Sequence, residues 1–562
     1  MVVMKDLEKK LFEKTWNFKN RDNIIHKLQE TEYDVLIIGG GITGAGIARE
    51  AVMRGLKVGL VEMQDFAAGT SSRSSKLAHG GLRYLAYGEL DLVKEATTER
   101  NWMRAHIPHL IRPVPFLWVN WKEDSGNKQS IESALKLYDS LSDDSQEFKN
   151  FKNYQWFSAE ELQELEPEIK DQVGQGGAIY YDNNVDDARL TIETLKEAVI
   201  RGADVISYCK VIDYIMEEDK ITGIKCQDLE NNKDFNIKGS LIVNATGIWS
   251  DNLLNNYPED VPKPLIRPTK GVHLIFKRKH ILNQNAVIVR SISQDRGFFV
   301  LPRGDFTIIG TTDTDFKGDI ANPFCNKEDA DDLINSVKYY FPNANIGYNN
   351  LIATYAGVRP LVKEIGKSER DVSRKHLIFF NRNGLLSVAV GKLTICRKMA
   401  EDLLEICAKK QIFSDITHDK GFSKQKFIIG LKHEEWQEFL KQNDIGLDDK
   451  ITHLYQQYGR GAFEIMRLIA EKPSLGEKIV DENDFVKAEI IYILRHELTT
   501  HLIDVFCRRT EMSLFIDHRK QSNAAKKVVD IMADEYQWDE DKKNQEIKTY
   551  LEYNRKTLEF IG

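Results

Sequence analysis

The sequence has few cysteines and no long apolar run, and each of these shortages excludes a class of protein. The six cysteines are scattered along 562 residues with no CxxC pair. The sequence therefore predicts neither a zinc site nor a disulfide framework, and a reducing compartment is expected. No run of ~18 uninterrupted apolar residues occurs, so no membrane-spanning helix is predicted. The first thirty residues mix Lys with Glu and have no apolar stretch, which predicts the absence of a secretory signal.

An excess of positive charge is also absent. The chain has 78 Lys and Arg residues against 86 Asp and Glu residues, a net charge of −8. A net acidic chain is a poor general binder of nucleic acid, so no nucleic-acid partner is predicted. An anionic substrate would need a local cluster of basic residues. Because hydrophobic residues make up 42% and aromatic residues 10% of the chain, buried cores are expected and wholesale disorder is excluded.

The clearest pattern is a β-α-β unit near the start of the chain. Residues 35–38 form an apolar run typical of a buried parallel strand, and 58–61 read as the next strand. Between them stands a Gly-x-Gly-x-x-Gly turn that opens a helix. Gly39 allows the tight turn, Gly41 lets a pyrophosphate approach the backbone, and Gly44 lets the helix pack closely on the strand. The context predicts a dinucleotide-binding turn, with the phosphates at the helix N-terminus.

Glu62 ends the second strand, about twenty residues after Gly41. A carboxylate there accepts hydrogen bonds from ribose hydroxyls and repels a 2′-phosphate, which argues against NADP. The choice between NAD and FAD stays open on this unit alone. Residues 241–247 form a second apolar strand ending in a small-residue turn at Gly247, which favours a flavin dinucleotide without establishing it.

A loop dense in hydroxyls and cations follows, from Gly69 to Lys76, and continues into His79-Gly80-Gly81-Leu82-Arg83-Tyr84. In isolation it could be a flexible surface loop. Its place one turn beyond a dinucleotide-binding unit suggests that it binds phosphate and the polar edge of a flavin, because a Gly-Gly pair permits close approach to a flat ring. Arg83 would then meet an anionic substrate.

The rest of the chain changes character twice. Residues 205–320 contain short alternating strands, which predict a mostly antiparallel sheet over the first domain. From about 397 onward the pattern is helical. Within 484–508, apolar residues recur at helical spacing and predict one core-facing helix. They are Ile490, Leu494, Leu498, Leu502 and Val505.

Further motifs follow in order along the chain between about residues 34 and 510. They are Thr70-Ser71-Ser72-x-Ser74-Ser75-Lys76-Leu77, Asp186-Asp187-Ala188-Arg189-Leu190, Lys270-Gly271-x-His273, Ile309-Gly310-Thr311-Thr312-Asp313, Gly357-Val358-Arg359-Pro360-Leu361, Ser373-Arg374-Lys375, Gly391-Lys392-Leu393-Thr394 and Arg508-Arg509-Thr510. With the glycine turn and the His79 motif, this series resembles the FAD-dependent glycerol-3-phosphate dehydrogenases, a family of D-amino-acid-oxidase-like flavoproteins.

The resemblance implies an α/β and α+β fold. A Rossmann-like FAD-binding domain is expected with an antiparallel-sheet substrate domain and an all-helical C-terminal domain. The expected boundaries are a helical arm at 1–30, an FAD-binding domain at 31–118, 185–255 and 350–405, a substrate-binding domain at 119–184 and 256–349, and a helical domain at 406–562.

The resemblance also implies FAD as the cofactor and no metal. The substrate implied is sn-glycerol 3-phosphate and the product dihydroxyacetone phosphate, in glycerol catabolism. The residues expected to hold the cofactor are Gly39, Gly41, Gly44, Glu62, Thr70, Ser71, Ser75, Val211, Gly247, Gly391, Leu393 and Thr394.

Four cations at motif positions would hold the substrate phosphate, since arginine's planar fork suits phosphate oxygens. They are Arg83, Arg359, Arg374 and Lys392. Without the motif context, any one of them could be an ordinary surface or salt-bridge residue. Tyr84 and Thr312 are expected to hydrogen-bond the substrate.

Oxidation of the secondary alcohol removes a proton and a hydride, and the hydride goes to the flavin. His273 is the first candidate for the base that takes the proton, and His79 is the second. The alternative for His273 is a satisfied core histidine on a strand. Arg359 is expected to stabilise the developing alkoxide, because its own pKa is too high for a simple base.

The electron acceptor implied is a membrane quinone, with the protein in the cytoplasm and peripheral on the inner face of the cytoplasmic membrane. A glycerol-3-phosphate oxidase that uses oxygen and releases hydrogen peroxide shares every motif and stays as the alternative. An amine or amino-acid oxidase of the same fold lacks a reason for the cation set, and a non-enzymatic flavoprotein is a further alternative. A homodimer and the strength of membrane contact stay open.

Overall fold

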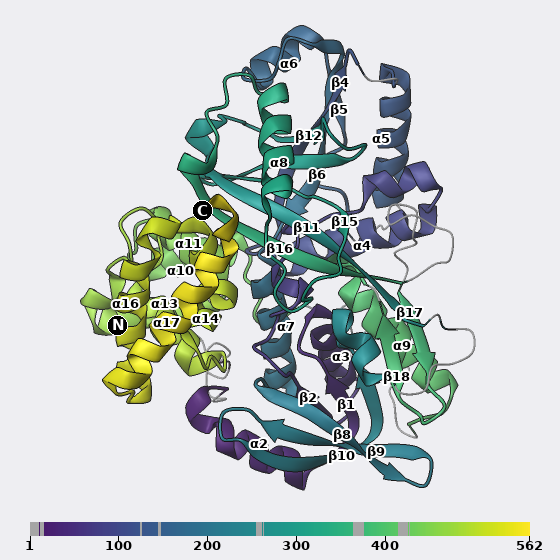
Figure 1. The fold of residues 1–562 in the computed structure, drawn as a ribbon, viewed down its shortest axis with the longest axis vertical. Helices are drawn as coiled ribbons and strands as arrows, with labels where there is room; N and C mark the ends of the chain where they lie inside the picture. Colours follow the sequence, from purple (N-terminus) through teal and green to yellow (C-terminus); the bar gives the residue numbers. More distant parts are fainter. Residues whose placement is uncertain are drawn as a thin grey trace.

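The computed structural model describes residues 11, 16–123, 126–143, 148–254, 261, 263–362, 376–389, 391–413, 425 and 427–562. These residues form two sheets and a helical region (Figure 1). The first sheet lies in the lower part of the view, the second in the upper part, and the late helices lie together at one side.

The first sheet has the order β17-β18-β10-β1-β2-β7, with β9 pairing β10 and β8 pairing β9. β1 lies parallel to both β2 and β10, which places the carboxyl ends of these strands at one edge. Helices α3, α7 and α9 pack together beside it. The bounds are β1 Glu32–Ile38, α3 Ile42–Met53, β2 Val58–Val61, α7 Asp187–Arg201, β7 Asp204–Ile206, β8 Cys209–Glu217, β9 Lys220–Asp228, β10 Lys233–Asn244, β17 Leu377–Phe380, β18 Leu386–Ala389 and α9 Cys396–Lys409.

The second sheet has the order β15-β11-β14-β13-β12-β4-β6-β3, with β16 on β11 and β5 on β6. Its pairs are antiparallel except β12 with β4. The bounds are β3 Leu77–Ala78, β4 Arg112–Trp121, β5 Gln155–Phe157, β6 Val173–Asn184, β11 Ile266–Lys277, β12 Ala286–Arg290, β13 Gly297–Arg303, β14 Phe306–Gly310, β15 Thr314–Asp315 and β16 Leu351–Val362, with helices α4 Leu90–His106, α5 Lys128–Asp143, α6 Ala159–Leu165 and α8 Lys327–Tyr340.

The helical region has its own apolar cores, separate from those of the sheets. The last residues return to the second sheet, where Thr354 Oγ1 donates to the carbonyl oxygen of Thr557 over 2.6 Å. The bounds are α10 His433–Gln442, α11 Asp449–Tyr458, α12 Gly461–Glu471, α13 Lys487–His496, α14 Leu502–Asp504, a π-helix Val505–Arg509, α15 Met512–Phe515, α16 Gln521–Tyr536 and α17 Glu540–Thr557.

These regions confirm the predicted fold class. Two of the predicted segments contribute to the sheets as follows. The predicted cofactor segment 350–405 is shared by the two sheets, because β16 lies in the second sheet and β17 and β18 lie in the first. Strand β9, taken from its alternation as part of the antiparallel sheet, instead extends the first sheet. The N-terminal arm is described only at residue 11 and from residue 16, and it contains helix α2 Arg21–Glu30.

The prediction of one continuous helix over 484–508 is wrong. The helix ends at His496 and helical structure resumes at Leu502. The apolar residues are all buried, as their spacing predicts. The interruption has a local cause, because Leu498 takes a positive φ of 40° and its N–H donates to the carbonyl oxygen of Trp16 over 2.8 Å. A contact with a distant segment therefore replaces the next helical turn.

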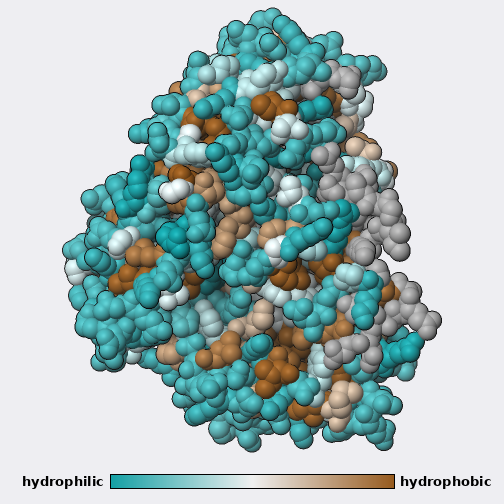
Figure 2. Space-filling view, viewed as in Figure 1, coloured by the Kyte–Doolittle hydropathy of each residue, from teal (hydrophilic) through white to brown (hydrophobic). Residues whose placement is uncertain are grey.

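The face shown in Figure 2 is mostly hydrophilic, and its hydrophobic residues occur as small separate groups. Among the helices of the described residues, none combines the length and the apolar character that a membrane crossing requires.

Candidate active site

A large cavity of about 1480 Å³ lies between the two sheets. Pockets for a single small molecule usually measure 300–1,000 Å³, so this one has room for a dinucleotide and a substrate together. One end is lined by the turn after β1 and the end of β2, which is where parallel sheets bind nucleotides. The other end is lined by β11, β12 and β16 of the second sheet.

The glycine turn shapes the first end through its backbone. Gly39 has a φ of +115°, which an L side chain rarely adopts. A Cβ on Gly44 would stand 1.9 Å from the carbonyl oxygen of Gly39, so only glycine lets the helix lie this close to the strand. Gly44 therefore packs beneath the cavity, whereas Gly39 and Gly41 line it. At the start of α3, the N–H of Ile42 donates to Ser71 Oγ over 3.0 Å.

The carboxylate of Glu62 is fixed at the end of β2. It accepts hydrogen bonds from the backbone N–H groups of Gly40 over 2.7 Å and Gln64 over 2.8 Å. Burial raises the pKa of Glu62 above its usual range. Glu62 lines the cavity, so the side chain is held where a ribose at the glycine turn would meet it.

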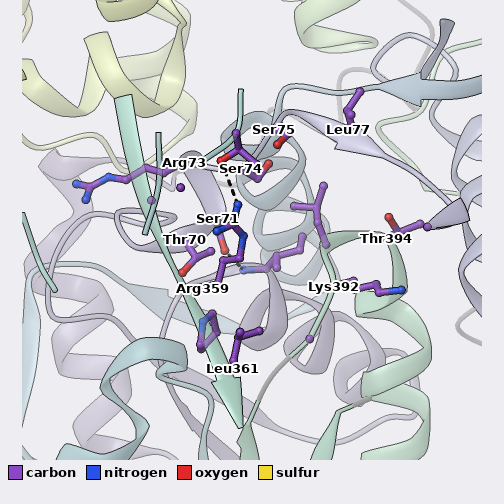
Figure 3. Close-up of a pocket in the computed structure, with 18 of the residues that line it drawn as sticks. Thr70, Ser71, Arg73, Ser74, Ser75, Leu77, Arg359, Leu361, Lys392 and Thr394 are labelled. Carbon is purple, nitrogen blue, oxygen red and sulfur yellow. Dashed lines mark hydrogen bonds between the residues drawn. The ribbon is translucent and has the colours of Figure 1, made fainter. Parts of the chain in front are cut away.

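The hydroxyl-rich loop is pinned along its length. Thr70 Oγ1 donates to the carbonyl oxygen of Val358 over 2.7 Å, and Ser74 donates to Asp187 through both its N–H and its hydroxyl. Figure 3 shows the Thr70, Ser71, Ser74 and Ser75 side chains close together on one side of the site, with Lys392 and Thr394 on the other. These bonds exclude the alternative of a flexible surface loop.

The next turn also needs glycine. The N–H of Gly80 donates to Tyr138 Oη over 2.9 Å, and a Cβ there would stand 2.3 Å from a methyl carbon of Thr97. His79 exchanges two hydrogen bonds of 3.2 Å with Thr394 Oγ1 through its backbone N–H and carbonyl. Segments far apart in sequence are thus tied together at the cavity wall.

The remaining predicted cofactor residues also line the cavity. Val211 comes from β8, and Gly247, with a φ of +59°, begins a short 3-10 helix after β10. Gly391, Leu393 and Thr394 precede α9. With the glycine turn, Glu62 and the hydroxyl loop, they form a cradle that fits an extended dinucleotide such as FAD.

His273 lies on β11 with its ring against the cavity. Ser75 Oγ is 2.9 Å from its Nε2, and the ring of Tyr355, which is opposite it in the β11–β16 register, stacks on it at 4.5 Å with an angle of 6°. Burial, followed by the positive charges of Arg359 and Lys76, holds the pKa of His273 well below its usual range. Among the described residues, its Nδ1 has no hydrogen-bond partner. Burial and the two nearby cations therefore favour the neutral form of the ring.

Arg359 lies beside His273, and its guanidinium is held in one orientation. It donates to Asp313 Oδ1 over 3.0 Å, to Thr311 Oγ1 over 3.0 Å and to the carbonyl oxygen of Thr312 over 3.2 Å. A fixed guanidinium at a cavity wall can stabilise negative charge that develops during a reaction, without reorganising.

Thr312 is not among the residues that line the cavity. It is 1% exposed, and its hydroxyl accepts a hydrogen bond of 3.0 Å from the N–H of Val272. The hydroxyl therefore completes the β11 backbone next to the last β14 pair, at His273 and Gly310. Its neighbours Thr311 and Asp313 line the cavity in its place.

Several cations line the cavity. Lys392 Nζ stands 3.7 Å above the ring of Tyr84, and the exposed Arg83 lies 5.9 Å from the same ring. Arg290 and Arg296, which were not predicted as site residues, also line the cavity. Arg290 ends β12 and Arg296 comes directly before β13, and no motif surrounds either residue in the sequence. Arg374 lies outside the described residues.

No group of three or more His, Cys, Asp and Glu side chains that could hold a metal ion occurs in the described part of the chain.

Comparisons with known proteins agree with this geometry. Residues 34–397 match the family described as "DAO: FAD dependent oxidoreductase", and residues 423–543 match the "C-terminal domain of alpha-glycerophosphate oxidase". The chain is 36% identical over 536 residues to the aerobic glycerol-3-phosphate dehydrogenase of Bacillus subtilis (strain 168), covering 93% of this chain and 95% of that protein. The same protein of Staphylococcus aureus (strain USA300) is 34% identical over 528 residues, covering 92% of this chain and 93% of that one.

Two solved structures extend the comparison. The X-ray structure of the glycerol-3-phosphate dehydrogenase from Bacillus halodurans complexed with FAD has a TM-score of 0.77 at 29% identity, covering 97% of this chain and 99% of that one. The L-alpha-glycerophosphate oxidase from Mycoplasma pneumoniae with FAD bound has a TM-score of 0.52 at 18% identity, covering 67% and 95%, which shows a shared fold.

Proposed function

We propose that this chain, which belongs to the family of FAD-dependent aerobic glycerol-3-phosphate dehydrogenases, oxidises sn-glycerol 3-phosphate to dihydroxyacetone phosphate. Its cofactor is FAD. The observation that carries the proposal is one continuous cavity. It joins the glycine turn to a neutral buried histidine, a fixed arginine and further cations.

At the glycine-turn end of the cavity, the chemistry of each residue indicates which part of FAD it would bind. The helix N-terminus after Gly41 would face the pyrophosphate, because its first N–H groups have no partner within the helix. Glu62 would accept hydrogen bonds from ribose hydroxyls. Thr70, Ser71 and Gly391 also line the cavity. FAD, when bound, supplies the acceptor for the hydride.

The substrate end would hold the phosphate and the reacting hydroxyl separately. Arg83 and Lys392, with Arg374 as a further predicted contact, would bind the phosphate dianion through charge-assisted hydrogen bonds. Tyr84 lies under the Lys392 ammonium and positions it. His273 would take the proton of the secondary hydroxyl, with His79 as the second candidate. Arg359 would stabilise the negative charge on that oxygen.

The test is anaerobic. Purified holoprotein is mixed with sn-glycerol 3-phosphate, and the flavin absorbance near its visible maximum is followed. We expect bleaching with sn-glycerol 3-phosphate and none with glycerol, which lacks the phosphate, or with an amino acid, which the amine-oxidase alternative would oxidise. Bleaching by an amino acid alone, or by none of the three, would reject the proposed substrate.

A quinone is the proposed electron acceptor, which would place the protein peripherally on the inner face of the cytoplasmic membrane. The relatives named above as aerobic dehydrogenases support a non-oxygen acceptor, whereas the matched C-terminal family is named after an oxidase. Reoxidation of the reduced protein by a soluble quinone analogue should be faster than by oxygen. Faster reoxidation by oxygen with formation of hydrogen peroxide would favour the oxidase. Sedimentation of the holoprotein would decide whether it forms a homodimer.

A further inference from the structure

Behind the wall that carries His273 lies a buried cluster of charges that the proposed reaction does not use. Lys76 Nζ pairs with Asp187 Oδ1 over 2.7 Å and with Glu511 Oε1 over 3.3 Å. Glu511 Oε2 in turn pairs with Arg303 over 2.5 Å. Lys76, Asp187 and Glu511 are each at most 5% exposed in their side chains.

The cluster joins three motifs that are far apart in the sequence. Lys76 ends the hydroxyl-rich loop, Asp187 begins α7, and Glu511 follows directly on Arg508-Arg509-Thr510 in the helical region. Burial alone would lower the pKa of Lys76, but Asp187 and Glu511 raise it above its usual range, so its ammonium stays charged. The helical region therefore contributes one of the two carboxylates that hold this ammonium.

Lys76 reaches His273 by two routes. Its ammonium lies 5.7 Å from the ring centroid of Tyr355, and the ring of His273 stacks on that same tyrosine at 4.5 Å. Its backbone neighbour Ser75 places Oγ 2.9 Å from His273 Nε2. Lys76 thus acts on His273 in two ways. Its buried side chain anchors the neighbouring Ser75, which binds the imidazole, and its ammonium places a positive charge behind the ring.

Other charged and titratable groups surround this arrangement. On the cavity side, Arg359 with its partner Asp313 faces His273. Behind it, burial and the nearby Glu511 raise the pKa of Asp186 to about 6, with Lys76 and Arg303 opposing. The Tyr355 phenol donates to the carbonyl oxygen of Ser74 over 2.9 Å, and burial raises its pKa above its usual range. Lys76 is therefore the cation behind the ring, and Arg359 the cation in front of it.

We propose that Lys76 is a positioning residue for His273, and that Glu511 of the helical region, by pairing with Lys76, sets how readily His273 accepts a proton. The proposal rests on the proposed role of His273 as the proton acceptor. It gives the helical region a part in the chemistry, because a carboxylate from that region adjusts the charge behind a ring on the cavity wall.

The direction of each expected change in the pKa of His273 follows from electrostatics. An ammonium near the ring disfavours the protonated imidazolium, so Lys76→Gln should raise the pKa of His273. Glu511→Gln removes negative charge near the ring and should lower that pKa. One charge at ~10 Å in an effective dielectric of ~20 corresponds to about one pH unit. The double variant Lys76→Gln/Glu511→Gln should return the pKa towards that of the parent protein.

A matched control lies on the same strand. Lys270 pairs with Asp329 Oδ2 over 2.6 Å and is also a buried lysine, but it stands three residues before His273 on β11. Side chains three apart on a strand point to opposite faces, and the cations that lower the pKa of His273 are Arg359 and Lys76. Lys270→Gln should therefore leave the pKa of His273 unchanged.

The experiment uses FAD-loaded protein and two measurements. The first follows exchange of the His273 C2–H with deuterium against pH, without substrate, by mass spectrometry of the peptide that contains it. The second follows the rate of anaerobic flavin reduction by sn-glycerol 3-phosphate against pH. The substrate's own titration is common to all variants, so differences between pH profiles belong to the protein.

The expected result is a pKa of His273 about one unit higher in Lys76→Gln, restored in the double variant and unmoved in Lys270→Gln. Lys76→Arg, which keeps the charge, should match the parent pH profile. A Lys76→Gln pKa that stays or falls overturns the proposal. If Lys76→Gln takes up no FAD, the Glu511→Gln variant tests the proposal instead. The acid limb of its pH profile of flavin reduction must then move to lower pH. If substrate fails to bleach the flavin, the proposed function fails while the exchange measurement still decides this inference.

Discussion

The two ends of the cavity are built in different ways. The glycine-turn end is made mainly by backbone from a short stretch, residues 38–44, with Glu62 from the next strand. The cation end is made by side chains from separate segments, three on strands of the second sheet and two beside or within short 3-10 helices. They are Arg83, His273, Arg290, Arg359 and Lys392.

The difference teaches how each end should fail. The backbone turn cannot accommodate a side chain, because there is no space at Gly44 for a single added carbon. A group of side chains can lose one member and keep the others, so its losses should be graded. The following substitutions test that contrast, beginning with the largest effect.

Gly44→Val should abolish FAD binding. The added Cβ would stand 1.9 Å from the carbonyl oxygen of Gly39, so the helix must move off the strand that holds the phosphates. The measurement is the ratio of flavin absorbance to protein absorbance after purification. Gly446→Val is the control, since a Cβ at this exposed glycine meets nothing within 4 Å. Normal flavin content in Gly44→Val would show that the turn tolerates movement.

His273→Gln should keep its flavin and lose turnover by about 10²–10⁴-fold, the usual cost of removing a general base. The amide keeps much of the shape of the ring but is a far weaker base. The rate of anaerobic flavin reduction in a stopped-flow instrument measures the loss. His280→Gln, a histidine outside the cavity lining, serves as the comparison. Near-parent rates would remove His273 from the role of base and bring His79 forward.

Arg359→Lys should reduce kcat/KM by about 10²–10³-fold, as expected when a preorganised donor to developing charge is lost. Lysine keeps the charge but cannot donate to Asp313 and Thr311 at once, as the guanidinium does. Steady-state rates with a quinone analogue give the value. Full activity in Arg359→Lys would mean that charge alone is needed and that the fixed orientation is not.

Lys392→Met should have the smallest effect, chiefly a rise in KM of about 10-fold, from one charge-assisted hydrogen bond to the phosphate. Its kcat should change little because other cations remain around the substrate. Saturation curves separate the two parameters. A fall in kcat at unchanged KM would move Lys392 from phosphate binding to the reacting end of the substrate.

The sequence predicted the glycine-turn end well because that end is local. The apolar run at 35–38, the glycine spacing and the separation to Glu62 are all set by neighbours along the chain, and β1, α3 and β2 have the predicted order. The same local logic failed over 484–508, where a contact between Leu498 and the distant Trp16 interrupts a periodic apolar pattern.

The cation end was predictable only through family motifs. Arg83, Arg359 and Lys392 were selected from them and line the cavity, but so do Arg290 and Arg296, which no motif identifies. Thr312 was selected as a substrate contact, yet its hydroxyl is used by the backbone of β11. Which way a strand side chain faces depends on register and on neighbouring strands, and residue type alone does not report it.

The amino-acid sequence by itself determined the dinucleotide turn, the fold class and the family, because these depend on spacing, periodicity and motif identity. Only the tertiary structure placed Ser75 and Tyr355 on His273, Asp313 on Arg359, and Glu511 of the helical region on Lys76. Those pairs join residues separated by up to several hundred positions. The electrostatic interactions within these pairs become strong only after folding has buried the groups together and removed the water that would screen them.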